Sequence, residues 1–179
     1  MKVTFFICWF LGGGGLNDNS RVKVAIGSDH AGFQLKQELK RELIELGYDV
    51  VDVGTDSEET CDYPDYALKV ALCVSEGEAS RGVLICGTGA GMSIVANKVK
   101  GIRAALCNEE YTARYSRLHN DANVVTMGSR VVSLEKAKSI LRDFVETSFE
   151  GERKDGLRHV RRLEKLARIE EMYCREVEG

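Results

Sequence analysis

The stretch VLICGTGAG at residues 83–91 decides the fold, because a short apolar run there passes directly into three glycines. Such a run is typical of a central parallel strand that is buried on both faces of a sheet. The glycines allow a tight turn whose N–H groups point outward at the start of a helix expected over 92–98. The segment therefore predicts a strand, an anion-binding loop and a helix in succession.

The same order of strand, turn and helix recurs from residue 22 onwards. Further strands are expected over 22–27, 48–53, 102–107 and 123–127, and further helices over 33–46, 65–76, 109–117 and 134–146. Strands that alternate with helices on short connections imply an open, mostly parallel sheet with helices on both faces. We therefore expect a doubly wound α/β fold with a five-stranded, Rossmann-like sheet in a three-layer α/β/α arrangement.

The domain organisation expected from the sequence is a single domain over residues 21–179, which ends in a basic amphipathic helix. Residues 1–20 are expected to form a flexible N-terminal extension. Its apolar run, 4–11, is too short for a transmembrane helix and lacks a convincing small-residue cleavage site. We therefore favour a non-native or misassigned start over a secretory signal.

The charge balance and the cysteines exclude several classes of protein. The net charge of -3 offers no electrostatic footprint for nucleic acid, and nothing indicates a membrane partner. The six cysteines include no CxxC pair, so we interpret them as reduced thiols of a cytoplasmic protein. No grouping of histidines and carboxylates has convincing metal-ligand spacing, and no metal is expected.

The glycine loop after the central strand resembles two nucleotide-binding motifs without matching either. Its third glycine comes one residue too early for GxGxxG, and Met92-Ser93 stands where a P-loop needs Lys followed by Ser or Thr. Glu109, after the next strand, occupies the place of a ribose-binding acid, which keeps a nucleotide-binding module open. Cys86 favours a different chemistry, since a thiol beside exposed N–H groups at a helix start is accessible and favoured as the thiolate.

The three histidines all lie beside polar residues at the ends of expected elements. We expect His30 and His119 at the edge of the sheet that binds ligand, and His159 within the C-terminal helix. A histidine in such a place is either a structural residue or a functional one. Arg158 and Arg162 are spaced i,i+4 on one helix face, which suits a phosphate clamp as well as it suits a solvated basic face.

Six motifs in a fixed order add a family resemblance to this interpretation. They are GSDHAG (27–32), DYP (62–64), CGTGAG (86–91), ANK (96–98), GIRAA (101–105) and HNDANV (119–124). Together they resemble the type B ribose-5-phosphate isomerases and the lactose-pathway sugar isomerases, over residues 22–169. The resemblance implies a homodimer or tetramer whose active sites are shared between subunits.

The resemblance also implies an activity. The expected reaction is the interconversion of ribose 5-phosphate and ribulose 5-phosphate in the pentose phosphate pathway, by proton transfer through an enediolate and without a cofactor. The expected catalytic residues are Cys86 as the base, Thr88 beside the oxyanion, and His119 with Asp29 nearby for opening the sugar ring. The expected substrate-binding residues are His30, Tyr63, Gly87, Gly89, Gly91, Ser93, Asn120, Arg158 and Arg162.

The sequence leaves some alternatives open. Residues 152–156 resemble an insertion, so either Arg153 or Arg158, and either Arg161 or Arg162, meets the phosphate. The substrate is alternatively a six-carbon sugar phosphate such as allose 6-phosphate or galactose 6-phosphate, because one extra carbon changes the pocket size rather than the residue types. A non-catalytic partner subunit is a further alternative.

Overall fold

The computed structural model describes residues 21–173, except for the side chain at position 152, so the extension expected over residues 1–20 lies outside the described residues. Five parallel strands form one sheet in the order β2-β1-β3-β5-β4. They are β1 Lys23–Ser28, β2 Asp49–Asp52, β3 Arg81–Cys86, β4 Ala104–Leu106 and β5 Val124–Gly128. All five expected strands are confirmed within a few residues of their predicted ends.

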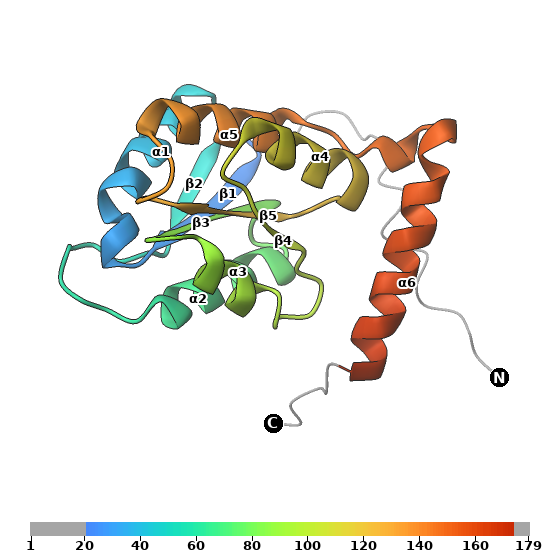
Figure 1. Cartoon of the computed structure of the whole chain (residues 1–179), viewed down its shortest axis with the longest axis horizontal. Helices are drawn as coiled ribbons and strands as arrows, with labels where there is room; N and C mark the ends of the chain where they lie inside the picture. Colours follow the sequence, from blue (N-terminus) through green and yellow to red (C-terminus); the bar gives the residue numbers. More distant parts are fainter. Residues whose placement is uncertain (1–20, 174–179) are drawn as a thin grey trace.

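Helices cover both faces of this sheet, as Figure 1 shows. Helices α1 Phe33–Glu45, α4 Glu110–Asn120 and α5 Leu134–Glu146 pack on one face, and α2 Tyr63–Ser75 and α3 Ala90–Ala96 pack on the other. The expected doubly wound, three-layer α/β/α arrangement is confirmed. No helix in the described part of the chain is long and apolar enough to cross a membrane.

The central strand β3 divides two apolar cores. Val83 and Ile85 point into the core under α1, α4 and α5, while Leu84 and Cys86 point into the core under α2 and α3. In the parallel register Cys86 lies opposite Gly128, the last residue of β5. The carboxyl ends of the central strands therefore meet at one edge of the sheet, where ligands of such folds bind.

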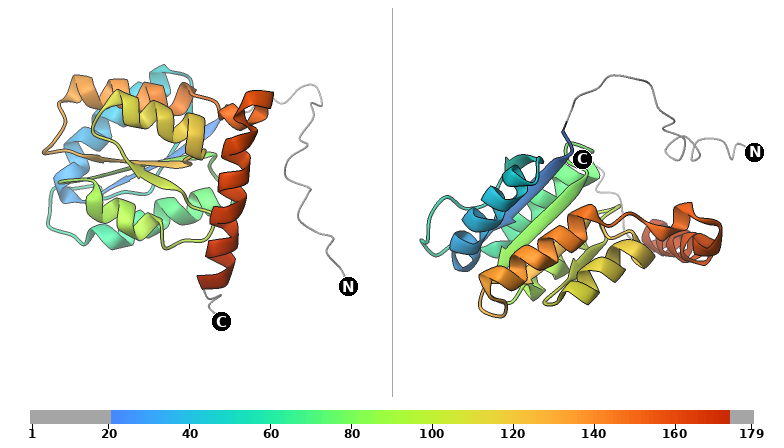
Figure 2. Two further views of the ribbon diagram at one scale, coloured as in Figure 1. Left: turned by 45° about the vertical axis from the view of Figure 1, so that its right-hand side comes forward. Right: turned by 90° about the horizontal axis from the view of Figure 1, so that it is seen from above.

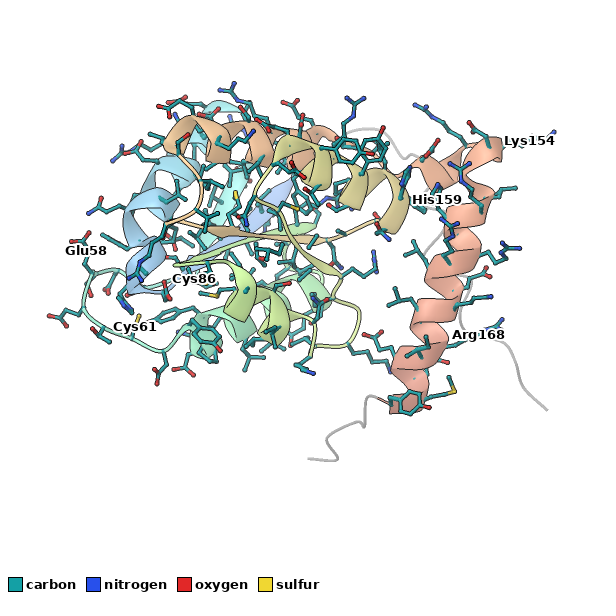
Figure 3. The ribbon with its side chains drawn as sticks, viewed as in Figure 1. Glu58, Cys61, Cys86, Lys154, His159 and Arg168 are labelled. Carbon is teal, nitrogen blue, oxygen red and sulfur yellow. The ribbon has the colours of Figure 1, made fainter. Side chains whose placement is uncertain are left out.

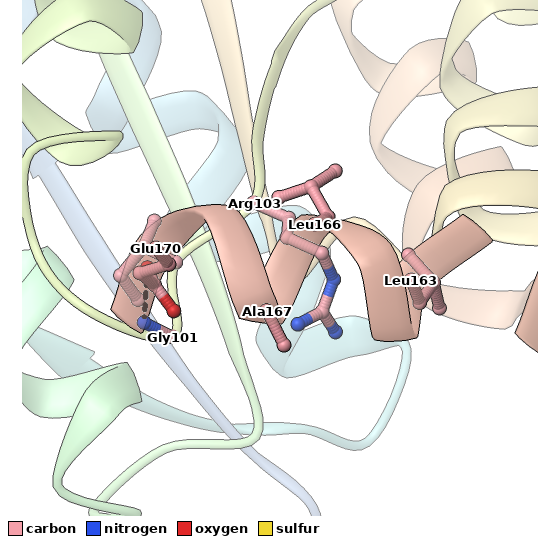
Figure 4. Close-up of a pocket in the computed structure, with 7 residues that line it drawn as sticks. Gly101, Arg103, Leu163, Leu166, Ala167 and Glu170 are labelled. Carbon is pink, nitrogen blue, oxygen red and sulfur yellow. Dashed lines mark hydrogen bonds between the residues drawn. The ribbon is translucent and has the colours of Figure 1, made fainter. Parts of the chain in front are cut away.

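Helix α6, Leu157–Tyr173, stands beside the sheet and extends past it (Figure 2). Two short 3₁₀ turns, η2 Glu150–Glu152 and η3 Lys154–Gly156, connect it to α5. Towards its end, Glu170 accepts the N–H of Gly101 at 2.8 Å, and Leu163 and Leu166 help to line a small cavity (Figure 4).

Much of the apolar side of α6 is left uncovered by residues 21–173. Leu157, Ile169, Met172 and Tyr173 are all more than half exposed. The helix expected at the C-terminus is thus confirmed, but the surface that would bury its apolar side chains is not supplied by the described residues.

Candidate active site

The loop between β3 and α3 holds the thiol of Cys86 against a backbone donor. The N–H of Gly89 donates to Cys86 Sγ at 3.1 Å, and the Cys86 side chain is only 5% exposed. A hydrogen bond that points at sulfur stabilises negative charge there. The geometry therefore places a sulfur atom that accepts a backbone hydrogen bond at the carboxyl edge of the sheet.

Two glycines of this loop are required by close neighbours. Gly89 has a φ of 80°, and a Cβ there would lie 2.6 Å from Leu106 Cδ1 and 2.8 Å from the carbonyl carbon of Met127. A Cβ on Gly91 would lie 2.8 Å from the ring of Tyr63. The absence of side chains thus lets the loop pass close to β5 and lets the Tyr63 ring lie against the start of α3.

The hydroxyl residues of the loop occupy different positions. Thr88 is exposed, and its Oγ1 accepts the N–H of Ala90 at 3.4 Å. Ser93 lies one turn into α3, where its hydroxyl donates to the Ala104 carbonyl at 3.5 Å. Thr88 is therefore an exposed hydroxyl of the glycine loop, and Ser93 is tied to the neighbouring strand.

The end of β1 brings Asp29 and His30 to the same edge of the sheet. The N–H of Asp29 donates to the carbonyl of Ile85, the residue before Cys86, at 3.3 Å. The buried Asp29 carboxylate accepts the N–H of Gly32 at 3.0 Å. His30 Nδ1 accepts the N–H of Cys61 at 3.3 Å, which ties the loop after β2 to this turn.

A buried ion pair at the end of β2 supports that loop. Lys36 Nζ lies 2.7 Å from Asp52, Lys40 Nζ lies 3.0 Å from it, and the Gly54 N–H donates to the same carboxylate. Burial raises the pKa of Asp52, but the hydrogen bonds from the two lysines outweigh it and hold that pKa below its ordinary value. The carboxylate therefore stays charged at neutral pH.

Arg130 was missed by sequence reasoning. Its side chain passes 3.6 Å from the position that a Cβ of Gly87 would take, which puts a positive charge beside the glycine loop. A cavity of ≈ 390 Å³ lined by Ala31, Gln34 and Arg130 opens next to it. The only sequence signal was an arginine three residues after the end of the strand expected over 123–127, and this does not say which loop the arginine meets.

His119 and Asn120 are at the opposite edge of the sheet, which corrects the expectation that His119 lies at the ligand edge with Asp29 nearby. They end α4, which runs antiparallel to β4 and so returns to the amino ends of the strands. The Asn120 carbonyl accepts from Arg103, which directly precedes β4. Within one chain His119 therefore does not meet Asp29 or Cys86.

At the amino edge His119 belongs to a compact polar cluster. Its ring stacks on that of His159 with centroids 4.3 Å apart, and both Nε2 atoms face Glu150 Oε2, at 3.5 and 3.6 Å. Burial, followed by the charge of Arg158 and by His119, lowers the pKa of His159. Figure 3 shows His159 far from Cys86.

Comparison with known proteins identifies the family. The model described as Ribose/Galactose Isomerase matches residues 24–166. The chain belongs to this isomerase family. Ribose-5-phosphate isomerase B of Escherichia coli is 51% identical over 149 residues, 83% of this chain and 97% of that one. A structure of ribose-5-phosphate isomerase B from Clostridium thermocellum superposes with a TM-score of 0.81 at 49% identity, covering 85% and 99% of the two chains.

The family is not uniform in substrate. A relative from Pectobacterium atrosepticum, 43% identical over 131 residues, 73% of this chain and 86% of that one, is named a D-erythrulose-4-phosphate isomerase. Family membership therefore establishes a sugar-phosphate isomerase framework, and the length of the sugar is a separate question.

In this isomerase, the arginines in and just before α6 lie on the side where the strands have their amino ends. Arg158 donates to the Asp155 carbonyl at 2.8 Å and has Nη2 4.0 Å from Glu150, so it borders the histidine cluster. Arg153, Arg161 and Arg162 are exposed. Within residues 152–156, Glu152 ends η2 and Lys154–Gly156 form η3, and Arg158 directly follows the first residue of α6.

The position of Glu109 weighs against the nucleotide-binding alternative. Strand β5 lies between β3 and β4, so Glu109, which follows β4, is not on the strand adjacent to the glycine loop. Its carboxylate instead accepts the hydroxyl of Thr112 at 3.1 Å, at the start of α4. A ribose-binding acid belongs on the neighbouring strand, beside the loop that binds the phosphates.

Proposed function

We propose that this chain is an aldose–ketose isomerase that interconverts ribose 5-phosphate and ribulose 5-phosphate, a step of the pentose phosphate pathway. The observation that carries the proposal is Cys86, a thiol that ends the central strand and accepts an N–H from the glycine loop. A positioned base beside backbone donors is what proton abstraction next to a carbonyl requires.

In this proposal the Cys86 thiolate removes the proton from C2 of the open-chain aldose. The C–H electron pair forms the C1=C2 double bond, and the carbonyl electrons move to O1 to give the enediolate. Thr88 and the loop N–H groups stabilise that oxyanion. The thiol then returns the proton to C1, the hydroxyl proton of O2 passes to O1, and C2 becomes the carbonyl carbon of the ketose. The sugar exchanges no electrons with another molecule, so the reaction needs no redox cofactor.

We further propose that the active site is completed by a second copy of the chain, in a homodimer or a tetramer. His119, Asn120, Arg158 and Arg162 lie on the amino-edge side, where they do not reach Cys86 of their own chain. Supplied by a partner, His119 would join Asp29 to open the ring, and the arginines would join His30 at the phosphate. The exposed apolar side chains of α6 support such an association.

A cytoplasmic location fits this mechanism. Cys61, Cys73, Cys86 and Cys107 are free thiols, and a cysteine base has to remain reduced to accept a proton. The reducing poise of the cytoplasm provides that condition.

The experiment that tests the proposed reaction is an isomerase assay on the purified full chain, with excess chelator and no added cofactor. We expect the highest kcat/KM on ribose 5-phosphate, measured against allose 6-phosphate, galactose 6-phosphate and erythrose 4-phosphate. A preference for a six-carbon or four-carbon sugar would reassign the substrate. No turnover of any of the four would favour a non-catalytic subunit, and NAD binding that survives Cys86→Ala would favour the nucleotide-binding alternative.

A further inference from the structure

The proposed isomerase mechanism uses only His119 from the cluster of His119, Glu150 and His159. Each of the cluster's three side chains offers one atom that can bind a metal ion, and these atoms all lie within 4.8 Å of one another. Among the described residues, this is the group of three histidine, cysteine or acidic side chains that meets this condition. Each residue comes from a different element: the last turn of α4, the turn η2 and the first turn of α6. These three elements therefore hold the cluster together from three sides.

The spacing within the cluster does not fit hydrogen bonding. Glu150 Oε2 lies 3.5 Å from His119 Nε2 and 3.6 Å from His159 Nε2. An N–H···O hydrogen bond is shorter, about 2.7–3.2 Å between the heavy atoms. Two ligands of one tetrahedral zinc ion, each about 2.0–2.1 Å from the metal, are separated by about 3.4 Å. The carboxylate oxygen is thus about one ligand–ligand separation from each ring nitrogen, and the orientation of the rings is what has to change for all three to share an ion.

His159 gives a second and independent sign of a missing ligand. Its side chain is 2% exposed, and neither ring nitrogen has a hydrogen-bond partner among the described residues. A buried imidazole normally has at least one nitrogen satisfied, because leaving both without a partner costs free energy. The Glu150 carboxylate lies at ion-pair distance from His159 Nε2, but no hydrogen bond joins the two groups.

We propose that His119, Glu150 and His159 form a binding site for a divalent transition-metal ion of the zinc class, with a fourth position left to solvent. Two imidazoles and one carboxylate are a ligand set that zinc accepts. The two rings are stacked with planes 8° apart, and the lone pairs of parallel rings do not converge. Binding therefore rotates one imidazole out of the stack.

The consequence for activity rests on the proposed function. An ion on Nε2 of His119 removes the group that is proposed to open the sugar ring, so the metal is an inhibitor of the isomerase. Arg158, with Nη2 4.0 Å from Glu150 Oε2, repels the ion and limits its affinity. The site thus makes turnover sensitive to free zinc, while the chelated enzyme is fully active.

The test measures zinc binding directly, by calorimetry on the full chain, and does not depend on activity. All variants carry Cys86→Ala, which removes the cysteine among the proposed active-site residues. We expect one zinc ion per chain in this background. His159→Asn and Glu150→Gln should each weaken binding by at least roughly tenfold, because each removes a ligand. The matched substitution His30→Asn, on a histidine at the other edge of the sheet, should leave the affinity unchanged.

A second measurement covers the case in which a variant does not fold. In the Cys86→Ala protein labelled with ¹⁵N, zinc should shift the ring-nitrogen signals of His119 and His159 and leave those of His30 in place. Unchanged ring signals, or equal zinc affinity in His159→Asn and its parent, would overturn the metal site. Neither result bears on the isomerase activity, which is measured with chelator present.

Discussion

The two edges of the sheet carry polar sites of opposite construction. At the carboxyl edge the backbone builds the site: Cys86, Asp29 and His30 each have a backbone N–H donating to the side chain. At the amino edge side chains face one another, and neither ring nitrogen of His159 has a hydrogen-bond partner among the described residues. The first site is complete as a base with its donors, whereas the second waits for a ligand or a second chain.

The largest expected effect concerns the base of the carboxyl-edge site. Cys86→Ala should lower kcat for ribose 5-phosphate by roughly a thousandfold or more, because no other group takes the proton. The melting temperature should change little, since alanine keeps an apolar side chain in this core. Steady-state kinetics measures kcat, and thermal unfolding measures the melting temperature. Retention of more than a small fraction of kcat would assign the proton transfer to another residue.

The glycine loop offers a matched pair of substitutions. Gly89→Ala should lower the free energy of unfolding by about 3 kcal/mol, from the strain of a positive φ together with overlap with Leu106 and the Met127 backbone. It should also lower kcat, because relieving this overlap shifts the backbone N–H of residue 89 away from Cys86 Sγ. Gly101→Ala has nearly the same φ, 81°, with nothing within 4 Å of the added Cβ, and should cost about 1 kcal/mol. Equal costs in denaturant titrations would mean that the close packing of the loop is unimportant.

A substrate that needs no ring opening distinguishes the role of His119 at the amino edge from that of Cys86 at the carboxyl edge. A four-carbon aldose 4-phosphate cannot close a furanose ring, because the oxygen that would close it carries the phosphate. His119→Asn should therefore lower kcat/KM for ribose 5-phosphate by roughly a hundredfold, and for erythrose 4-phosphate far less. The same proportional loss on both sugars would give His119 a role in proton transfer or binding instead.

The smallest expected effect belongs to the phosphate anchor. Arg162→Ala should raise KM for ribose 5-phosphate by roughly tenfold and leave kcat nearly unchanged, because a phosphate contact far from C1 and C2 is made equally in the ground and transition states. Arg161→Ala, the neighbouring exposed arginine, is the control. If KM rises with Arg161→Ala instead, the two arginines exchange roles.

The fold and the carboxyl-edge site were predictable from the sequence because both depend on local signals. An apolar run followed by glycines places Cys86 and the loop without knowledge of any distant contact. The amino-edge site was misplaced, although the antiparallel return of α4 would have put His119 at the correct edge. Glu150 and Arg130 were missed, since nothing near them in sequence shows that one meets two histidines and the other meets Gly87.

The central claim, that the two sites form one active centre only across two chains, is tested most directly by mixing variants. Cys86→Ala and His119→Asn should each be strongly impaired on ribose 5-phosphate when pure. After the two are unfolded and refolded together, half of the dimers are mixed and each holds one intact centre, so activity should return to about a quarter of the wild-type level. A mixture no more active than its pure components would contradict a shared active site.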